Sequence, residues 1–277
     1  MNSERHVLVH AHIFKNAGTT FDFSLQRSFG EAFTDHREDA RFLEGRNAYL
    51  LDYLAGHPGV SALSSHSLHF RIKSTDKIRL HPIYFLRHPL ARVWSVYRFE
   101  KQQTGVDTEG ARRAKEMDLN AYVDWYLQDG SPATIRDIHT IFLSGEGPSP
   151  DNMARKFVLA SQFLARDRAI FAVVERFDDA MLVIENRLKP VFPELDLAYV
   201  RHNVSAADPD QDVAESASAL LAGLEPRVAD RLQAGNARDM ALYRLANAQL
   251  DLALAGISDL EGKRADFARR CRHLQSG

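Results

Sequence analysis

Short runs of apolar residues alternate with polar, glycine-containing stretches over the first two thirds of the chain. Each run is shorter than an ordinary helix and carries Val, Ile, Leu or Phe, which is typical of strands buried on both faces of a sheet. The predicted strands cover residues 6–14, 60–65, 82–86 and 169–174.

Between these strands the apolar residues recur at helical spacing. Phe21, Leu25 and Phe29 share one helix face, and Gly30 can end that helix. Strands that alternate with helices predict an α/β fold with a mainly parallel central sheet flanked by helices, and a helical C-terminal part. Further helices are predicted from Pro89 onward, over residues 119–128, 152–164 and 178–188, and from 214 to the end, whereas the polar residues 102–115 predict an exposed loop.

Four polar side chains follow the predicted strands directly. They are Lys15, His66, Arg87 and Glu175. Because parallel strands end at the same edge of a sheet, where ligands of such folds bind, we expect these side chains to converge.

Composition limits the class of protein. The 277 residues are 45% hydrophobic and 26% charged with a net charge of −2, so no global attraction to nucleic acid is expected. The single cysteine, Cys271, excludes a disulfide framework and a cysteine zinc site. No signal peptide is expected, and Arg244 and Asp251 interrupt the most apolar late stretch, so we expect a cytoplasmic protein without stable membrane insertion. The oligomeric state stays open.

The turn after the first strand has the chemistry of a phosphate site. A turn that enters a helix offers free backbone N–H groups and a positive dipole end. Gly18 permits close approach, Thr19 and Thr20 add hydroxyl donors, and Lys15 adds a charge. An ordinary turn with a surface lysine is the alternative.

An ATP-dependent kinase would use a similar turn. Its motif places Lys after the last Gly, followed by Ser or Thr for magnesium. Here Lys15 precedes Gly18, and the first glycine of that motif is missing. The order of residues therefore favours a site that does not need a metal-bound nucleotide.

A second anion site is predicted after the third strand. Arg87 presents a planar fork suited to phosphate, and Ser95, on the following helix, can donate a hydroxyl hydrogen bond. Solvated or structural roles for Arg87, Arg92 and Arg98 are the alternative.

These two segments carry a family resemblance. HIFKNAGTT (residues 12–20) resembles the 5′-phosphosulfate loop of sulfotransferases that use 3′-phosphoadenosine 5′-phosphosulfate (PAPS), and FLRHPLARVWSVYRF (residues 85–99) resembles their 3′-phosphate motif. The branch that contains heparan sulfate 2-O-sulfotransferases and bacterial relatives is the most similar. Weaker matches are SSHSLHF (64–70), IFLSG (141–145), VVERFDDAM (173–181), RHNVS (201–205) and NARDMALYRLA (236–246).

The resemblance implies a role for each matching residue. It implies one sulfotransferase domain, with a P-loop-like nucleotide-binding core over about residues 5–200 and a helical extension over about 205–277.

Lys15 would contact the transferring sulfonate, His66 would be the general base, and His69 is the runner-up. Glu175 could orient Lys15 or His66, or cap a helix; Phe14 departs from the family, which has Pro there. The loop Asn16, Ala17, Gly18, Thr19 and Thr20 would hold the 5′-phosphate, and Arg87 and Ser95 the 3′-phosphate.

The predicted function is sulfonate transfer from PAPS to a hydroxyl of a carbohydrate or glycoconjugate by in-line displacement, leaving PAP and requiring no metal. A small-molecule kinase that uses ATP and a non-catalytic PAP-binding module are the alternatives. Two basic runs could bind an anionic glycan or be solvated surface, and three aromatic residues could stack on sugars or form core. The basic runs are Arg71, Lys73, Lys77 and Arg79, and Arg112, Arg113 and Lys115; the aromatic residues are Tyr122, Trp125 and Tyr126.

Overall fold

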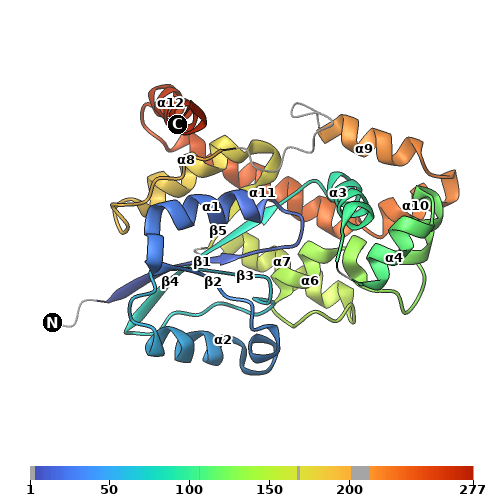
Figure 1. The fold of residues 1–277 in the computed structure, drawn as a ribbon, viewed down its shortest axis with the longest axis horizontal. Helices are drawn as coiled ribbons and strands as arrows, with labels where there is room; N and C mark the ends of the chain where they lie inside the picture. The colour runs from blue at the N-terminus through green and yellow to red at the C-terminus, as the bar shows by residue number, and fades with distance from the viewer. Residues whose placement is uncertain (1–3, 106, 167–168, 201–212, 277) are drawn as a thin grey trace.

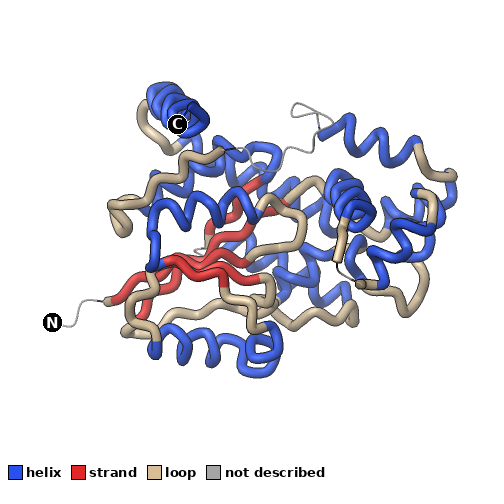
Figure 2. The backbone as a smooth tube through the Cα atoms, viewed as in Figure 1, coloured by secondary structure: helices blue, strands red, loops and turns tan. Residues whose placement is uncertain are grey.

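The computed structural model describes residues 4–105, 107–166, 169–200 and 213–276. Its centre is a five-stranded parallel sheet of order β2-β3-β1-β4-β5 (Figures 1 and 2). This confirms the predicted α/β fold with a parallel sheet. The strands are β1 (Arg5–Ala11), β2 (Phe33–Asp35), β3 (Ala62–Ser65), β4 (Ile78–Leu86) and β5 (Ile170–Val173).

Helices cover both faces of this sheet and continue into a helical C-terminal part, as predicted. They are α1 (Gly18–Phe29), α2 (Asp39–Gly56), α3 (Pro89–Gln102), α4 (Glu109–Glu116), α5 (Leu119–Tyr126), α6 (Ile138–Ser144), α7 (Met153–Arg166), α8 (Phe177–Leu188), α9 (Val213–Ala222), α10 (Pro226–Ala234), α11 (Ala237–Ala255) and α12 (Leu260–Ser276). Short 3₁₀ turns are η1 (Gly30–Ala32), η2 (Ala133–Ile135) and η3 (Val174–Arg176). None of the described helices combines the length and apolarity needed to cross a membrane.

Alternate residues of β1 face two different cores. Val7 and Val9 pack with α2, α6, α7 and α11 on one side of the sheet. Leu8 packs with α1, α8 and α12 on the other side. A third apolar cluster joins α3, α4, α5, α9 and α10, and Figure 1 shows these helices beyond the end of the sheet that lies opposite the N-terminus. The helical cluster therefore adjoins the carboxyl ends of the strands.

Two sequence predictions need correction. Part of the loop predicted for residues 102–115 is the helix α4, which Thr108 caps by accepting the N–H of Ala111. Its polar face faces solvent while Ala111 and Ala114 are buried, so the small apolar face was hidden in a polar sequence. The first strand ends at Ala11, not at residue 14, so His12 already belongs to the loop.

Three further elements, β2, α2 and α6, were not predicted. Within α2, Arg46 has φ 50° and interrupts the helical geometry.

The start of α1 depends on a residue without a side chain. A Cβ at Gly18 would lie 1.9 Å from Nε2 of His12. The His12 ring cannot swing aside, because it is 7% exposed and lies between the rings of His10 and His66, at centroid distances of 4.9 and 3.8 Å. Gly18 is thus required by close packing as well as by any ligand.

We expect Gly18→Ala to lower the free energy of unfolding by about 1–3 kcal/mol, the usual cost of overpacking. The measurement is urea unfolding followed by circular dichroism. Gly56→Ala is the matched control, because a Cβ there meets nothing within 4 Å; it should be neutral or stabilise by up to about 1 kcal/mol. Equal unfolding midpoints for Gly18→Ala and the wild type would contradict this packing account.

Candidate functional site

The strand register brings the four predicted side chains to one edge. Ala11 of β1 lies opposite Ser65 of β3 and Tyr84 of β4, and Leu86 of β4 lies opposite Val173 of β5. The loop with Lys15, and then His66, Arg87 and Glu175, therefore leave neighbouring strands at the same edge. Their sequence positions alone predicted this convergence.

The loop between β1 and α1 holds two non-glycine residues in the left-handed region, Lys15 at φ 64° and Ala17 at φ 58°. Such residues cost on the order of 1–3 kcal/mol each and cluster at ligand sites. Ala17 is the N-cap of α1, and no side chain caps this helix end. The first-turn N–H groups of Gly18, Thr19 and Thr20 are therefore available to an anion.

The Asn16 side chain is directed away from this helix end. It is 1% exposed, and its Nδ2 donates to the carbonyl of Phe85 at 2.6 Å and lies 2.9 Å from Nε2 of His139. The amide therefore fastens the loop to β4 and α6. Both hydrogens of the Asn16 amide are engaged within the protein, so this side chain shapes the loop backbone.

Lys15 and Arg87 form a pair of neighbouring cations. Nη1 of Arg87 donates to the carbonyl of Lys15 at 3.1 Å, while its buried Nε has no hydrogen-bond partner among the described residues. Nζ of Lys15 lies 4.4 Å from the ring centroid of Phe99. Burial, and then the charge of Arg87, lower the pKa of Lys15 to about 8. These two neighbouring cations lie at a helix N-terminus and attract an anion, although the Glu175 carboxylate, 4.0 Å from Nε of Arg87, offsets part of their charge.

Glu175 caps the start of a helix, one of the two roles left open for it. Its Oε1 accepts the backbone N–H of His88, where α3 begins, at 2.9 Å and lies 4.0 Å from Nε of Arg87. Tyr243 lies close to the same carboxylate, whose pKa burial raises. Glu175 therefore fixes the strand end that carries Arg87.

Ser95 and Arg92 differ sharply within α3. Arg92 is 1% exposed and donates to the carbonyls of Phe14 and Thr134, so its role is structural. Ser95 is half-buried and has no hydrogen-bond partner among the described residues. It precedes Phe99 by one helical turn and so shares a face with the ring beneath Lys15. A hydroxyl is thereby left available near the two cations.

One ring nitrogen of His66 is held by the loop after β1. Its Nδ1 lies 2.9 Å from the carbonyl of His12, which can only accept, so Nδ1 carries the proton and Nε2 keeps a lone pair. Burial, followed by the charge of His12, lowers the pKa of His66 and keeps it neutral at pH 7. His69 packs on Phe142 at 4.2 Å, and burial lowers its pKa to about 4.

His10, His12 and Asp22 form a cluster beside His66 that sequence reasoning missed. Their ligand-type atoms lie within 4.8 Å of one another. Nδ1 of His10 is 2.7 Å from Asp22 Oδ1, whereas a tetrahedral cation would separate two ligands by about 3.3 Å. The cluster is therefore a hydrogen-bonded group. It holds the His12 ring between Gly18 and His66, and the alternation of His10 and His12 along a strand was the available signal.

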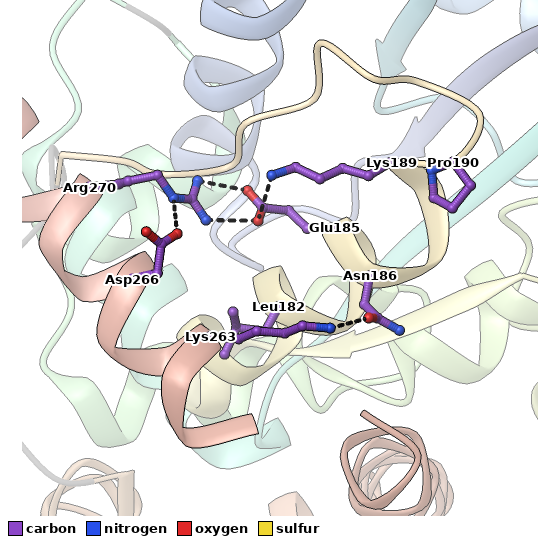
Figure 3. Close-up of a pocket in the computed structure, with 8 residues that line it drawn as sticks. All are labelled: Leu182, Glu185, Asn186, Lys189, Pro190, Lys263, Asp266 and Arg270. Atoms are coloured by element: carbon purple, nitrogen blue, oxygen red, sulfur yellow. Dashed lines mark hydrogen bonds and ion pairs between the residues drawn. The ribbon is translucent and has the colours of Figure 1, made fainter. Parts of the chain in front are cut away.

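A cavity of about 460 Å³ lies away from this edge, between α8 and α12 (Figure 3). Most of its charges pair with one another: Arg270 with Glu185 and Asp266, and Lys189 with Glu185. Lys263 donates to the neutral amide of Asn186. We assign this cavity no function. The lining residues are Leu182, Glu185, Asn186, Lys189, Pro190, Lys263, Asp266 and Arg270.

The surface candidates for acceptor binding are mostly engaged elsewhere. Tyr122 and Tyr126 are buried, which confirms the core alternative for them. Arg71 stacks on Phe163 and donates to the carbonyl of Leu159. Three more cations of the basic runs have acidic partners, in the pairs Arg79–Glu4, Arg112–Asp107 and Arg113–Glu109. The matching segment 201–205 lies outside the described residues.

Comparisons with known proteins cover most of the chain. A family model described as "Sulfotransferase family" matches residues 1–246. An uncharacterized protein of Archaeoglobus fulgidus is 26% identical over 244 residues, which span 86% of this chain and 95% of that protein.

We expect Lys15 to titrate near pH 8 instead of at the ordinary lysine value of 10.5, because burial and Arg87 disfavour its ammonium form. The measurement is NMR of reductively ¹³C-methylated protein over pH 6–11, with Lys15→Gln to assign the signal. Arg87→Gln should raise the midpoint. Affinity for a phosphate-bearing ligand should fall from pH 7 to 9, as the cation is lost; a midpoint at or above the ordinary value would contradict the site's electrostatics.

Proposed function

Because the chain belongs to the sulfotransferase family, we propose that it transfers a sulfonate group from PAPS to a hydroxyl of an acceptor. The observation that carries the proposal is the coupling of two anion sites. Arg87, which follows β4, is hydrogen-bonded to the backbone of Lys15 in the loop after β1. A donor with phosphates at both its 3′ and 5′ positions matches two such sites.

In this proposal the two sites divide the donor between them. The N–H groups at the start of α1 and the hydroxyls of Thr19 and Thr20 hold the 5′-phosphate, in the loop that Asn16 and Ala17 shape. Arg87, whose Nε has no hydrogen-bond partner among the described residues, and Ser95 hold the 3′-phosphate. The buried Nε fits this donor, since it would otherwise lose the hydrogen bonds of water without replacement.

PAPS supplies the activated sulfonate when it is bound. Nε2 of His66 takes the proton of the acceptor hydroxyl as the hydroxyl oxygen forms its bond to sulfur. The bond from sulfur to the bridging oxygen breaks, and Lys15 and the loop N–H groups stabilise the negative charge that develops on that oxygen. The donor leaves as PAP, and the proton leaves later from His66.

We propose an alcohol on a carbohydrate or glycoconjugate as the acceptor. The support is the resemblance of the two motifs to the heparan sulfate 2-O-sulfotransferase branch. Because several cations of the basic runs already have acidic partners, the proposal does not require a highly anionic glycan.

The donor assignment is tested by calorimetry with PAP and ATP. We expect PAP to bind without magnesium and ATP to bind much more weakly. Arg87→Ala should weaken PAP about tenfold or more, because a charge-assisted contact contributes about 1.5–3 kcal/mol. The affinity for 5′-AMP, which lacks the 3′-phosphate, should change less.

Two experimental results would contradict the assignment of PAPS as the donor and favour another function. ATP affinity equal to that of PAP, or strict dependence on magnesium, favours the small-molecule kinase. Tight PAP binding without sulfonate transfer from ³⁵S-labelled PAPS to any of a panel of alcohols and glycans favours the binding module.

The base assignment is tested by turnover. His66→Ala should lower kcat about 10²–10⁴-fold while PAP affinity stays near that of the wild type, because the base touches the acceptor. Since the neutral imidazole is the active form and its pKa is lowered, wild-type kcat should hold down to pH 6.5 and fall below it. The variant should lack this acidic limb. His69→Ala is the control, and loss of turnover in that variant but not in His66→Ala would assign the base to His69.

A further inference from the structure

The first residues of α11 are joined to the start of α6 by a buried carboxylate. Asp239 is 1% exposed and accepts three hydrogen bonds of 2.8 Å, from the backbone N–H groups of His139 and Thr140 and from the Thr140 hydroxyl. Asp137, at the start of α6, accepts the N–H of Asp239 in return at 3.0 Å. Each helix start is thus capped by a carboxylate from the other helix, which fixes their relative position.

This joint reaches the 5′-phosphate loop through one side chain. His139 is fully buried, with Nδ1 3.2 Å from Asp239 and Nε2 2.9 Å from Nδ2 of Asn16. Because Nδ2 of Asn16 can only donate, Nε2 of His139 accepts and Nδ1 carries the proton toward Asp239. The other hydrogen of Nδ2 goes to the carbonyl of Phe85. Both hydrogens of this amide are therefore used to hold the loop.

A second side chain of α11 reaches the 3′-phosphate segment. Tyr243 follows Asp239 by four residues and so lies on the same helix face. Its hydroxyl lies close to the carboxylate of Glu175, which accepts the N–H of His88 and lies beside Arg87. The Tyr243 and His88 rings also meet edge to face, at 5.5 Å between centroids.

We propose that α11 is the part of the molecule that sets the relative position of the two phosphate sites, with Asp239 and Tyr243 as positioning residues. This inference rests on the proposed function. Neither residue belongs to the predicted ligand contacts. Asp239 acts on the 5′ loop through His139 and Asn16, and Tyr243 acts on Arg87 through Glu175. One helix face thus controls two loops that follow different strands.

The test compares three ligands that share the adenosine group: PAP, 5′-AMP and 3′-AMP. Tyr243→Phe removes the phenol hydroxyl beside Glu175, so it should weaken PAP and 3′-AMP about three- to tenfold, the usual range for one polar contact, and leave 5′-AMP within about twofold. Asp239→Asn should weaken PAP and 5′-AMP by at least as much and leave 3′-AMP within about twofold. Dissociation constants come from calorimetry, with displacement titration for weak ligands.

Two further variants separate positioning from general stability. His139→Leu keeps the backbone hydrogen bonds to Asp239 but removes the contact to Asn16, so it should reproduce the Asp239→Asn pattern even if that variant does not fold. His139→Gln, whose amide can accept from Asn16, should restore 5′-AMP affinity. Tyr199→Phe is the matched control, since it loses a tyrosine hydrogen bond of 2.6 Å to Asp178; all three affinities should stay at wild-type values.

The outcomes distinguish this inference from the function beneath it. Selective loss of 3′-AMP affinity in Tyr243→Phe, together with selective loss of 5′-AMP affinity in Asp239→Asn or His139→Leu, supports positioning by α11. Equal loss of all three ligands, or no loss in folded Tyr243→Phe and His139→Leu, overturns it while the donor assignment stands. A wild-type protein that binds none of the three ligands overturns the proposed function and the inference together.

Discussion

The amide of Asn16 lies between two left-handed residues, and its two hydrogen bonds keep the loop after β1 in that unfavourable conformation. The rest of the site depends on this constraint. It directs the first-turn N–H groups of α1 outward, and it places the Lys15 carbonyl where Arg87 can donate to it. Strain of about 1–3 kcal/mol per residue persists only where the surroundings oppose relaxation. Here the carbonyl of Phe85 in β4 and the ring of His139 in α6 hold Asn16 and so prevent the loop from relaxing.

The base and the donor loop share a neighbour. The carbonyl of His12 fixes the tautomer of His66, while the ring of His12 packs against Gly18. Asp22 holds His12 from the side, at 3.3 Å, and holds His10 at 2.7 Å. A displacement of His12 would therefore move the proposed base and the phosphate loop together. In the proposed mechanism this coupling would keep the proton acceptor and the transferring sulfonate at a fixed separation, which proximity effects in catalysis require.

The sequence predicted the architecture well where periodicity was strong. The four predicted strands form the sheet with β2 at its edge, and the helix of Phe21, Leu25 and Phe29 ends at Gly30 as predicted. Prediction failed for α4, where a small buried face is hidden among charges, and for α6. Most of α6 is buried and its start is capped by Asp239, a carboxylate 100 residues away. Local sequence patterns do not predict a helix whose capping group comes from another part of the chain.

The sequence by itself determined the sheet edge and the residue types gathered there, because strand ends and glycine-containing turns follow from local spacing. Lys15, His66, Arg87 and Glu175 could all be named on that ground, whereas Ser95 was named from its place on the helix after Arg87. Only the tertiary structure decided how they are held. Asn16 meets His139 across 123 residues, and α11 reaches the site through Asp239 and Tyr243. Such contacts join single polar side chains that have no periodicity, and they form only when packing has excluded water and brought the groups together.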